Sequence, residues 1–232
     1  MKVSLVVTVK DPGPALAEFL TSVRAQTRIP DEVVVVDGGS TDGSLALLER
    51  EPAVTLTRAP GSNIARGRNL AVKAAAHDVI AVSDGDCVLA HDWLEHLAAA
   101  VEEGADVAMG FSRPIAETFF QACSAAVSLP EEHEVDPLGF MPSSRSLAFR
   151  REAFEAAGGY PEWLDVGEDM YLNHRFRELA LRMDFVPAAL AFWRVRPTVA
   201  ATWRQYYRYA RGDGEAGMFP ERHAARFAVY GA

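Results

Sequence analysis

Two acidic turns follow short apolar runs in the first part of the chain. The run 33–36 leads into a polar, glycine-rich turn that begins with Asp37, and the run 79–82 leads into Asp84-Gly85-Asp86. Short apolar runs of this kind indicate strands that are buried on both faces. Because ligands of open α/β sheets bind beyond the carboxyl ends of the strands, we expect these carboxylates at a binding site.

Asp84 and Asp86 stand one residue apart, so on a tight turn both carboxylates can converge on a hard divalent cation. Mg²⁺ takes one or two carboxylates together with substrate phosphate oxygens, an arrangement that suits a nucleotide diphosphate. Asp and Gly are also common in turns without any ligand. The position of this turn after a buried strand favours the binding site.

A third acidic pair, Glu168 and Asp169, stands at the expected start of a helix, after a glycine-rich loop. Carboxylates in a first helical turn are stabilised by the helix dipole, so the pair could serve the helix alone. A positioned carboxylate can also act as a general base that takes the proton of an attacking hydroxyl. Both interpretations stay open at this point.

Two further groups of polar residues fall on expected helices. Arg66, Arg68 and Asn69 lie near the start of the helix before the fourth strand, where they could contact a base, a ribose or phosphates or be solvated. The segment 205–209, next to Trp203, could line a site or form an amphipathic surface face with extended arginines.

The hydrophobic pattern predicts an α/β fold. Strands are expected at 3–9, 33–36, 54–57, 79–82, 107–109 and 146–149, and helices at 16–23, 45–48, 65–76, 94–101 and 168–181. This alternation indicates βαβ units, and hence a mostly parallel, Rossmann-like sheet flanked by helices. Residues 112–142 interrupt the alternation with several prolines and an acidic cluster, and we expect an insert or mobile loop over the site there.

Composition limits the classes of partner. The chain has 232 residues and a net charge of −9, which argues against a nucleic-acid partner. The segment from residue 194 onward, however, contains seven arginines and three acidic residues, so its net charge is positive. This basic segment is expected either to meet phosphate or an anionic membrane surface, or to be a solvated helix face. Two cysteines, no signal peptide and no long apolar run predict a cytoplasmic protein.

Taken together, these motifs resemble the family 2 glycosyltransferases, a large inverting family with the GT-A fold. The turn after 33–36 is similar to the family's nucleotide-binding strand end, and Arg66-Gly67-Arg68-Asn69 resembles its Arg-Asn element. Asp84-Gly85-Asp86 stands where the family has its metal motif. The loop at 158–160 with 167–169 resembles the Gly-Gly loop and Glu-Asp motif. The segment 205–209 resembles the Gln-x-x-Arg-Trp motif, with Tyr209 in place of Trp.

The resemblance implies a donor-binding half at 1–111 and an acceptor-binding, catalytic half at 112–232 of one GT-A domain. It implies Asp169 as the catalytic base with Glu168 in support, and Mg²⁺ or Mn²⁺ held by Asp86 and Asp84. The remaining implied contacts divide into two groups. Donor contacts would come from Thr8, Val9, Asp37, Gly39, Arg66, Asn69, Asp84, Gly85 and Asp86, and acceptor or diphosphate contacts from Gln205, Arg208 and Tyr209.

We therefore expect transfer of a sugar from a nucleotide-diphosphate-sugar to the hydroxyl of a saccharide or lipid-linked acceptor, with possible contact between the basic segment and the inner membrane. Many family members carry a second acidic residue where this chain has Gly38, so UDP is favoured as the nucleotide but not fixed. Tyr209 in place of Trp weakens an assignment as a processive synthase. A sugar nucleotidyltransferase and a catalytically silent donor-binding module are the alternatives.

Overall fold

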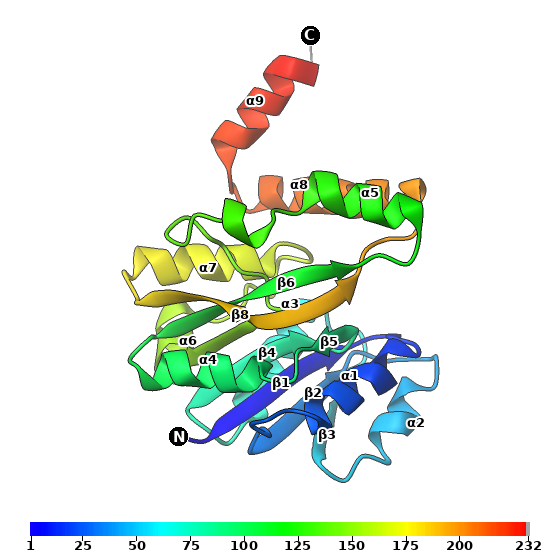
Figure 1. The fold of residues 1–232 in the computed structure, drawn as a ribbon, viewed down its shortest axis with the longest axis vertical. Helices are drawn as coiled ribbons and strands as arrows, with labels where there is room; N and C mark the ends of the chain where they lie inside the picture. The colour runs from blue at the N-terminus through cyan, green and yellow to red at the C-terminus, as the bar shows by residue number, and fades with distance from the viewer. Residues whose placement is uncertain (231–232) are drawn as a thin grey trace.

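An eight-stranded sheet with helices on both faces forms the body of the protein in a computed structural model that describes residues 1–230 (Figure 1). The strands are β1 (Val3–Val9), β2 (Glu32–Asp37), β3 (Val54–Arg58), β4 (Val79–Asp84), β5 (Cys87–Leu89), β6 (Val107–Ile115), β7 (Leu147–Arg150) and β8 (Met183–Arg194). The helices are α1 (Ala15–Arg24), α2 (Ser44–Leu48), α3 (Ile64–Ala74), α4 (Trp93–Glu102), α5 (Phe119–Ser128), α6 (Arg151–Ala157), α7 (Glu168–Glu178), α8 (Val199–Glu215) and α9 (Pro220–Tyr230).

The strand order is β3-β2-β1-β4-β7-β6-β8-β5. β1 pairs in parallel with both β2 and β4, and β2 pairs in parallel with β3. Thr8 lies opposite Asp84 and Val9 lies opposite Asp37, so the first two acidic turns leave the sheet at the same edge. The expected α/β sheet is confirmed, but it is mixed, because β7 runs antiparallel between β4 and β6.

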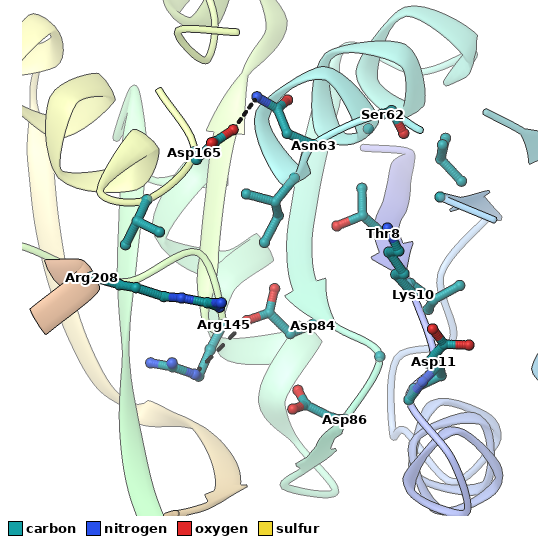
Figure 2. Close-up of a pocket in the computed structure, with 18 of the residues that line it drawn as sticks. Thr8, Lys10, Asp11, Ser62, Asn63, Asp84, Asp86, Arg145, Asp165 and Arg208 are labelled. Carbon is teal, nitrogen blue, oxygen red and sulfur yellow. Dashed lines mark hydrogen bonds and ion pairs between the residues drawn. The ribbon is translucent and has the colours of Figure 1, made fainter. Parts of the chain in front are cut away.

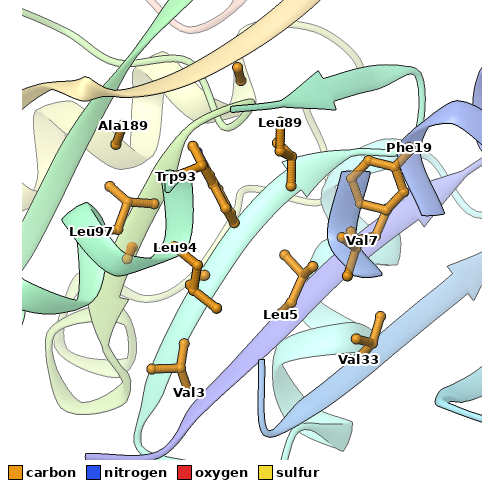
Figure 3. Close-up of a cluster of buried hydrophobic side chains, with 14 of the residues drawn as sticks. Val3, Leu5, Val7, Phe19, Val33, Leu89, Trp93, Leu94, Leu97 and Ala189 are labelled. Atoms are coloured by element: carbon orange, nitrogen blue, oxygen red, sulfur yellow. The ribbon is translucent and has the colours of Figure 1, made fainter. Parts of the chain in front are cut away.

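Two apolar clusters fix the helices on the sheet. On one face, the buried sides of α1 and α4 cover β1 and β4, with Phe19, Trp93 and Leu97 at the centre (Figure 3). On the other face, α3, α6 and α7 cover the same strands and β7, through residues such as Phe149 and Phe176. The helical spacing of these apolar residues in the sequence therefore becomes the two faces of the core.

The second half of the chain differs from the sequence-based expectation. Residues 112–142 are not simply a loop, because β6 continues to Ile115 and α5 follows it. β8 has no counterpart among the expected strands, and it contains Pro187, a residue that disfavours a strand interior. The strand tolerates this proline at an irregularity, where the pairing with β6 jumps from Val186 to Leu190. β5, of three residues, adds an antiparallel edge to β8.

The C-terminal helices lie beyond this sheet. α8 follows β8 across one end of the molecule, near α5, and α9 projects away from the body (Figure 1). Within residues 1–230, no helix combines the length and the apolar character needed to cross a membrane.

Gly110 marks a close approach that holds β6 against its neighbours. A Cβ at this position would come 1.8 Å from Ser146 Oγ and 2.6 Å from the backbone oxygen of Ala189. Ser146 Oγ is already committed, because it accepts a hydrogen bond from Trp93 Nε1 and donates one to that same Ala189 oxygen, both at 2.7 Å. We therefore expect Gly110→Ala to lower the free energy of unfolding by at least about 2 kcal/mol, measured by urea denaturation.

Gly214→Ala is the matched control, because a Cβ at Gly214, on helix α8, meets no atom within 4 Å. This variant should keep or slightly raise the stability, since alanine is favoured over glycine in a helix. Equal stability of the two variants would show that the β6 contact is not as close as described.

Candidate active site

A cavity of about 870 Å³ opens at the carboxyl ends of β1, β2 and β4 (Figure 2). Its volume falls in the range of ligand pockets, roughly 300–1,000 Å³. The end of β1 contributes Thr8 and Val9, and the end of β4 contributes Asp84-Gly85-Asp86. Asp165 and Val166 come from the loop before α7, and Arg208 and Arg211 from α8. Segments from both halves of the sequence thus enclose one space.

The turn 84–86 is held tightly against β1. A Cβ on Gly85 would lie 2.5 Å from Val9 Cγ1, so this position needs a glycine for the turn to approach the strand. Asp84 and Asp86 both line the cavity, but their carboxylates differ in their partners. Asp84 Oδ1 accepts a hydrogen bond from Arg68 Nη2 at 2.6 Å. Within the described part of the chain, the side chain of Asp86 receives only a weak contact from Cys87 Sγ, at 4.0 Å.

The surroundings of this turn shift the pKa values of the two aspartates in opposite directions. Burial disfavours the ionised form of Asp84, but the positive charges of Arg68 and Arg145 outweigh it and lower its pKa. Burial, together with the negative charge of Asp84, raises the pKa of Asp86. A cation at Asp86 would relieve that repulsion. One available carboxylate beside a second one therefore fits a divalent cation that also takes phosphate oxygens from a ligand.

A buried arginine connects this turn to the third acidic pair. The Arg68 side chain is 3% exposed, and it forms ion pairs with Asp84 and with Glu168 at the start of α7. Its guanidinium also lies 5.4 Å from the ring centroid of Tyr160. Burial and the neighbouring carboxylate of Asp169 raise the pKa of Glu168 to about 7, in spite of the opposing charge of Arg68.

Asp169 does not itself line the cavity, but it contacts Ser144, and the neighbouring Arg145 does line it. Asp169 is half-buried, and its Oδ2 accepts a hydrogen bond from the backbone N–H of Ser144 at 3.4 Å. The next residue, Arg145, lines the cavity, and its guanidinium is stacked 4.3 Å from the centroid of the Trp193 ring. Unlike Glu168, Asp169 makes no ion pair with a described residue within 4.0 Å. Among the described residues, the carboxylate of Asp169 is thus the member of the pair that is not held in an ion pair.

At the β1–β2 end of the cavity, two buried polar atoms have no partner within the described chain. One belongs to Thr8, which lines the cavity, and the other to Asp37, which stands between the lining residues Val36 and Gly38 but does not itself line it. Asp37 is 1% exposed, and its Oδ1 accepts hydrogen bonds from the N–H groups of Gly39 and Ser40. Its Oδ2 and Thr8 Oγ1 are buried without a partner among the described residues. Because unpaired buried polar atoms are costly, this end suits a ligand that offers hydrogen bonds, such as a nucleoside.

Several other residues named from the sequence lie outside the cavity lining, as do Asp37, Glu168 and Asp169. Arg66 is exposed. The side-chain amide of Asn69 donates to the backbone oxygen of Tyr160 and accepts from its N–H, which fixes the glycine-rich loop. Gln205 Nε2 donates to Tyr209 Oη at 2.6 Å along α8, and neither residue reaches the lining, whereas Arg208 does. Gly39 supplies the turn after β2 rather than a wall of the cavity.

The sequence analysis did not single out several lining residues. They include Lys10, Ser62, Asn63, Arg145, Asp165, Trp193, Arg196 and Arg211. Asn63 carries a visible signal, because asparagine before a helix indicates an N-cap; it accepts from the N–H of Arg66 and donates to Asp165 Oδ1. Arg145 has no such signal, since its place depends on β7 pairing between β4 and β6.

Comparison with known proteins identifies relatives of this chain. The sequence model described as "Glycosyl transferase family 2" matches residues 4–156. The chain is 26% identical over 208 residues to the O-antigen chain rhamnosyltransferase RfbN of Salmonella typhimurium, covering 82% of this chain and 65% of that protein. It is 30% identical over 200 residues to the succinoglycan biosynthesis protein ExoA of Rhizobium meliloti, covering 80% and 61%. The chain thus spans less than two thirds of either relative.

Solved structures share the fold. Residues 1–349 of S. aureus TarS in complex with UDP-GlcNAc superpose with a TM-score of 0.70 at 21% identity, over 85% of this chain and 60% of that one. The same TarS segment without a ligand in its description superposes with a TM-score of 0.71 over 99% of this chain and 75% of that one. At this level of identity the match establishes the fold, and the chain has the GT-A architecture of those structures.

The arginine that joins Asp84 to Glu168 should dominate the stability of this region. Arg68→Met keeps most of the apolar stem but removes the cation of buried Glu168 and the nearer of the two cations beside the partly buried Asp84. We therefore expect a loss of about 3–5 kcal/mol in the free energy of unfolding. Arg66→Met, two residues earlier on the exposed face of α3, should change stability by no more than about 0.5 kcal/mol. Chemical denaturation of both variants measures the difference, and similar values for the two would contradict the buried bridge.

Proposed function

This chain belongs to glycosyl transferase family 2, and we propose that it transfers a sugar from a nucleotide-diphosphate-sugar to an acceptor hydroxyl. The observation that carries the proposal is the acidic turn Asp84-Gly85-Asp86 in the wall of the cavity, with one carboxylate held by Arg68 and the other available. Relatives that are named as a rhamnosyltransferase and as glycosyltransferases support the same class of reaction.

The donor would lie along the edge of β1, β2 and β4. Its nucleoside would occupy the end near Thr8 and Asp37, where buried oxygens have no hydrogen-bond partner among the described residues. Its diphosphate would lie near the turn 84–86. Uridine is the first nucleoside to test, because a solved structure with this fold is in complex with UDP-GlcNAc. The identity of the sugar is left to experiment.

The cation of this proposal is Mg²⁺ or Mn²⁺, held by Asp86 with Asp84 beside it. The raised pKa of Asp86 and its lack of a strong partner within the described chain support this assignment. A divalent cation at this point would neutralise the negative charge that develops on the departing diphosphate. The guanidinium groups of Arg145 and Arg208 also line the cavity and would add positive charge around the same phosphates.

Asp169 is the proposed general base. Its carboxylate takes the proton of the acceptor hydroxyl while the hydroxyl oxygen forms a bond to the anomeric carbon. The bond from that carbon to the diphosphate oxygen breaks, and its electron pair leaves with the diphosphate. Attack from the face opposite the leaving group inverts the anomeric centre. Glu168 is the positioning residue, because its ion pair with Arg68 fixes the first turn of α7 on which Asp169 lies.

The acceptor is proposed to be a saccharide or a lipid-linked saccharide, and the site of action the cytoplasm. The acceptor would reach the cavity on the side of Asp165 and α8, since β1 and β2 close the donor end. A donor-binding module without activity would share the donor site but not turn over, so the two experiments below separate it from a transferase.

Donor binding should depend on both the cation and Asp86. A thermal shift with UDP and Mn²⁺ should reveal a rise of several degrees, because a ligand at about 100 times its Kd adds roughly 2.7 kcal/mol of stability. Chelation of the metal, or Asp86→Asn, should remove most of that rise. Asp92→Asn, on an exposed side chain before α4, is the control that should keep it. An Asp86→Asn variant with the full rise would refute the metal assignment.

Turnover should depend on Asp169 more than donor binding does. Asp169→Asn keeps the shape of the side chain but cannot accept the proton, so we expect kcat to fall by roughly 10²–10⁴-fold, with a nearly unchanged UDP thermal shift. Glu178→Gln, an exposed position at the other end of α7, should retain full activity. Steady-state release of the nucleotide diphosphate measures both. If Asp169→Asn were as active as the parent protein, the base would have to be sought elsewhere.

A further inference from the structure

Helix α8 carries an apolar face that points away from the body of the protein. Val199, Trp203, Tyr206 and Tyr207 follow one another at the spacing i, i+4, i+7, i+8, which places them on one side of the helix. All four are exposed, Trp203 by 71% and Tyr207 by 63%. The buried residues of α8, Gly212 and Asp213, lie in the last turn of the helix, beyond this stripe.

The same kind of spacing elsewhere in the protein faces the core. In α1, Leu16, Phe19, Leu20 and Val23 form such a stripe, and all of them are buried. An outward stripe with three large aromatic side chains is therefore a departure from the pattern of this fold. Exposed apolar surface of this kind marks an interaction site.

A second apolar helix surface lies close to the start of α8. α5 contains no charged residue, and it exposes Phe119 by 86% and Val127 by 87%. The helix is fixed near α8, because Gln121 Nε2 donates to the backbone oxygen of Val195 at 2.8 Å, just before α8 begins. Both helices lie at the same end of the molecule (Figure 1). The two apolar surfaces therefore share one end of the fold.

The charges beside the α8 stripe are positive. Arg204, directly after Trp203, is exposed beside the stripe, and Arg208, directly after Tyr207, is also exposed but lines the cavity. The carboxylates of the last turns are already paired, Glu215 with Arg211 and Asp213 with Arg222. This distribution is opposite to the net charge of −9 of the whole chain. Acidic residues at 131–136 follow α5 in the sequence. Electrostatic attraction between this end of the molecule and an anionic surface must therefore come from the arginines of α8.

We propose that the outward face of α8, with the start of α5, docks on an anionic lipid surface. Trp and Tyr are enriched at membrane interfaces, and a helix with an apolar face flanked by arginines lies in the plane of such an interface. A second copy of this chain fits less well, because a twofold contact through this face would place the arginines of one copy near those of the other. Negative lipid headgroups complement the same arginines.

Helix α8 contributes residues to both the docking face and the cavity. On the basis of the proposed function, the contact with lipid therefore bears on how the acceptor reaches the cavity. Arg208 and Arg211 of α8 line the cavity, while Trp203 and Tyr207 face outward. A lipid surface in contact with the outer side of α8 therefore lies within one helix of the acceptor side of the cavity. This placement suits an acceptor that is itself attached to a lipid.

Flotation with vesicles tests the docking face directly. The full chain should float with vesicles of phosphatidylglycerol and phosphatidylcholine, but not with phosphatidylcholine alone or in high salt. The double variant Trp203→Ala, Tyr207→Ala should bind at least about tenfold more weakly, and Arg204→Gln about fivefold. Ile29→Ala, an exposed apolar side chain before β2, is the control that should bind like the parent protein.

Three outcomes would overturn the proposal. The parent protein could remain in the aqueous fraction with anionic vesicles, the double variant could float as well as the parent, or sedimentation could show a dimer that the double variant loses. The UDP thermal shift of the double variant is measured in parallel and should be unchanged. If the parent protein shows no UDP thermal shift but still floats with anionic vesicles, the result counts against the proposed transferase activity and leaves the docking result intact.

Discussion

The buried charge of Arg68 is the constraint on which the rest of the site depends. A guanidinium that is 3% exposed needs carboxylate partners, and it finds Asp84 at the end of β4 and Glu168 at the start of α7. The two partners are distant in sequence, so one side chain sets the distance between the end of β4 and the start of α7. Each partner is followed by a second carboxylate, Asp86 or Asp169, that the arginine does not engage. The arrangement divides the four acids into two that hold the structure and two that remain available for chemistry.

This division has an electrostatic cost that a ligand can relieve. Burial and repulsion between neighbouring carboxylates raise the pKa of Asp86 and of Glu168, although Arg68 and the partly buried Arg145 lie among the four acids. Functional sites commonly retain such unfavourable arrangements. The cation proposed at Asp86 would relieve part of this repulsion. Arg145 limits the cost, because its Nε lies 3.8 Å from Asp84 Oδ2, while Arg68 pairs with Oδ1.

The sequence predicted the first half of the fold better than the second, and the reason is physical. β1 to β4 follow one another with helices between them, so local hydrophobic periodicity reports both the elements and their order. β7, β6 and β8 pair across long intervals, and Pro187 sits at an irregularity that only the register of β6 and β8 makes acceptable. The acidic turns could be placed because they end buried strands. Arg145 could not, since nothing near it in the sequence says that its strand would insert beside β4.

Helix α8 comes from a segment whose sequence was open to two interpretations, part of the site or an amphipathic surface, and it has features of both. Arg208 lines the cavity, while Trp203, five residues earlier on the helix, is exposed. In a helix with 3.6 residues per turn, a cation and an aromatic ring point to different sides only if the number of residues between them does not correspond to a whole number of turns. The physical coupling between the surface and the site is then rigid, because any partner that orients the outer side of α8 also fixes the arginines that face the cavity.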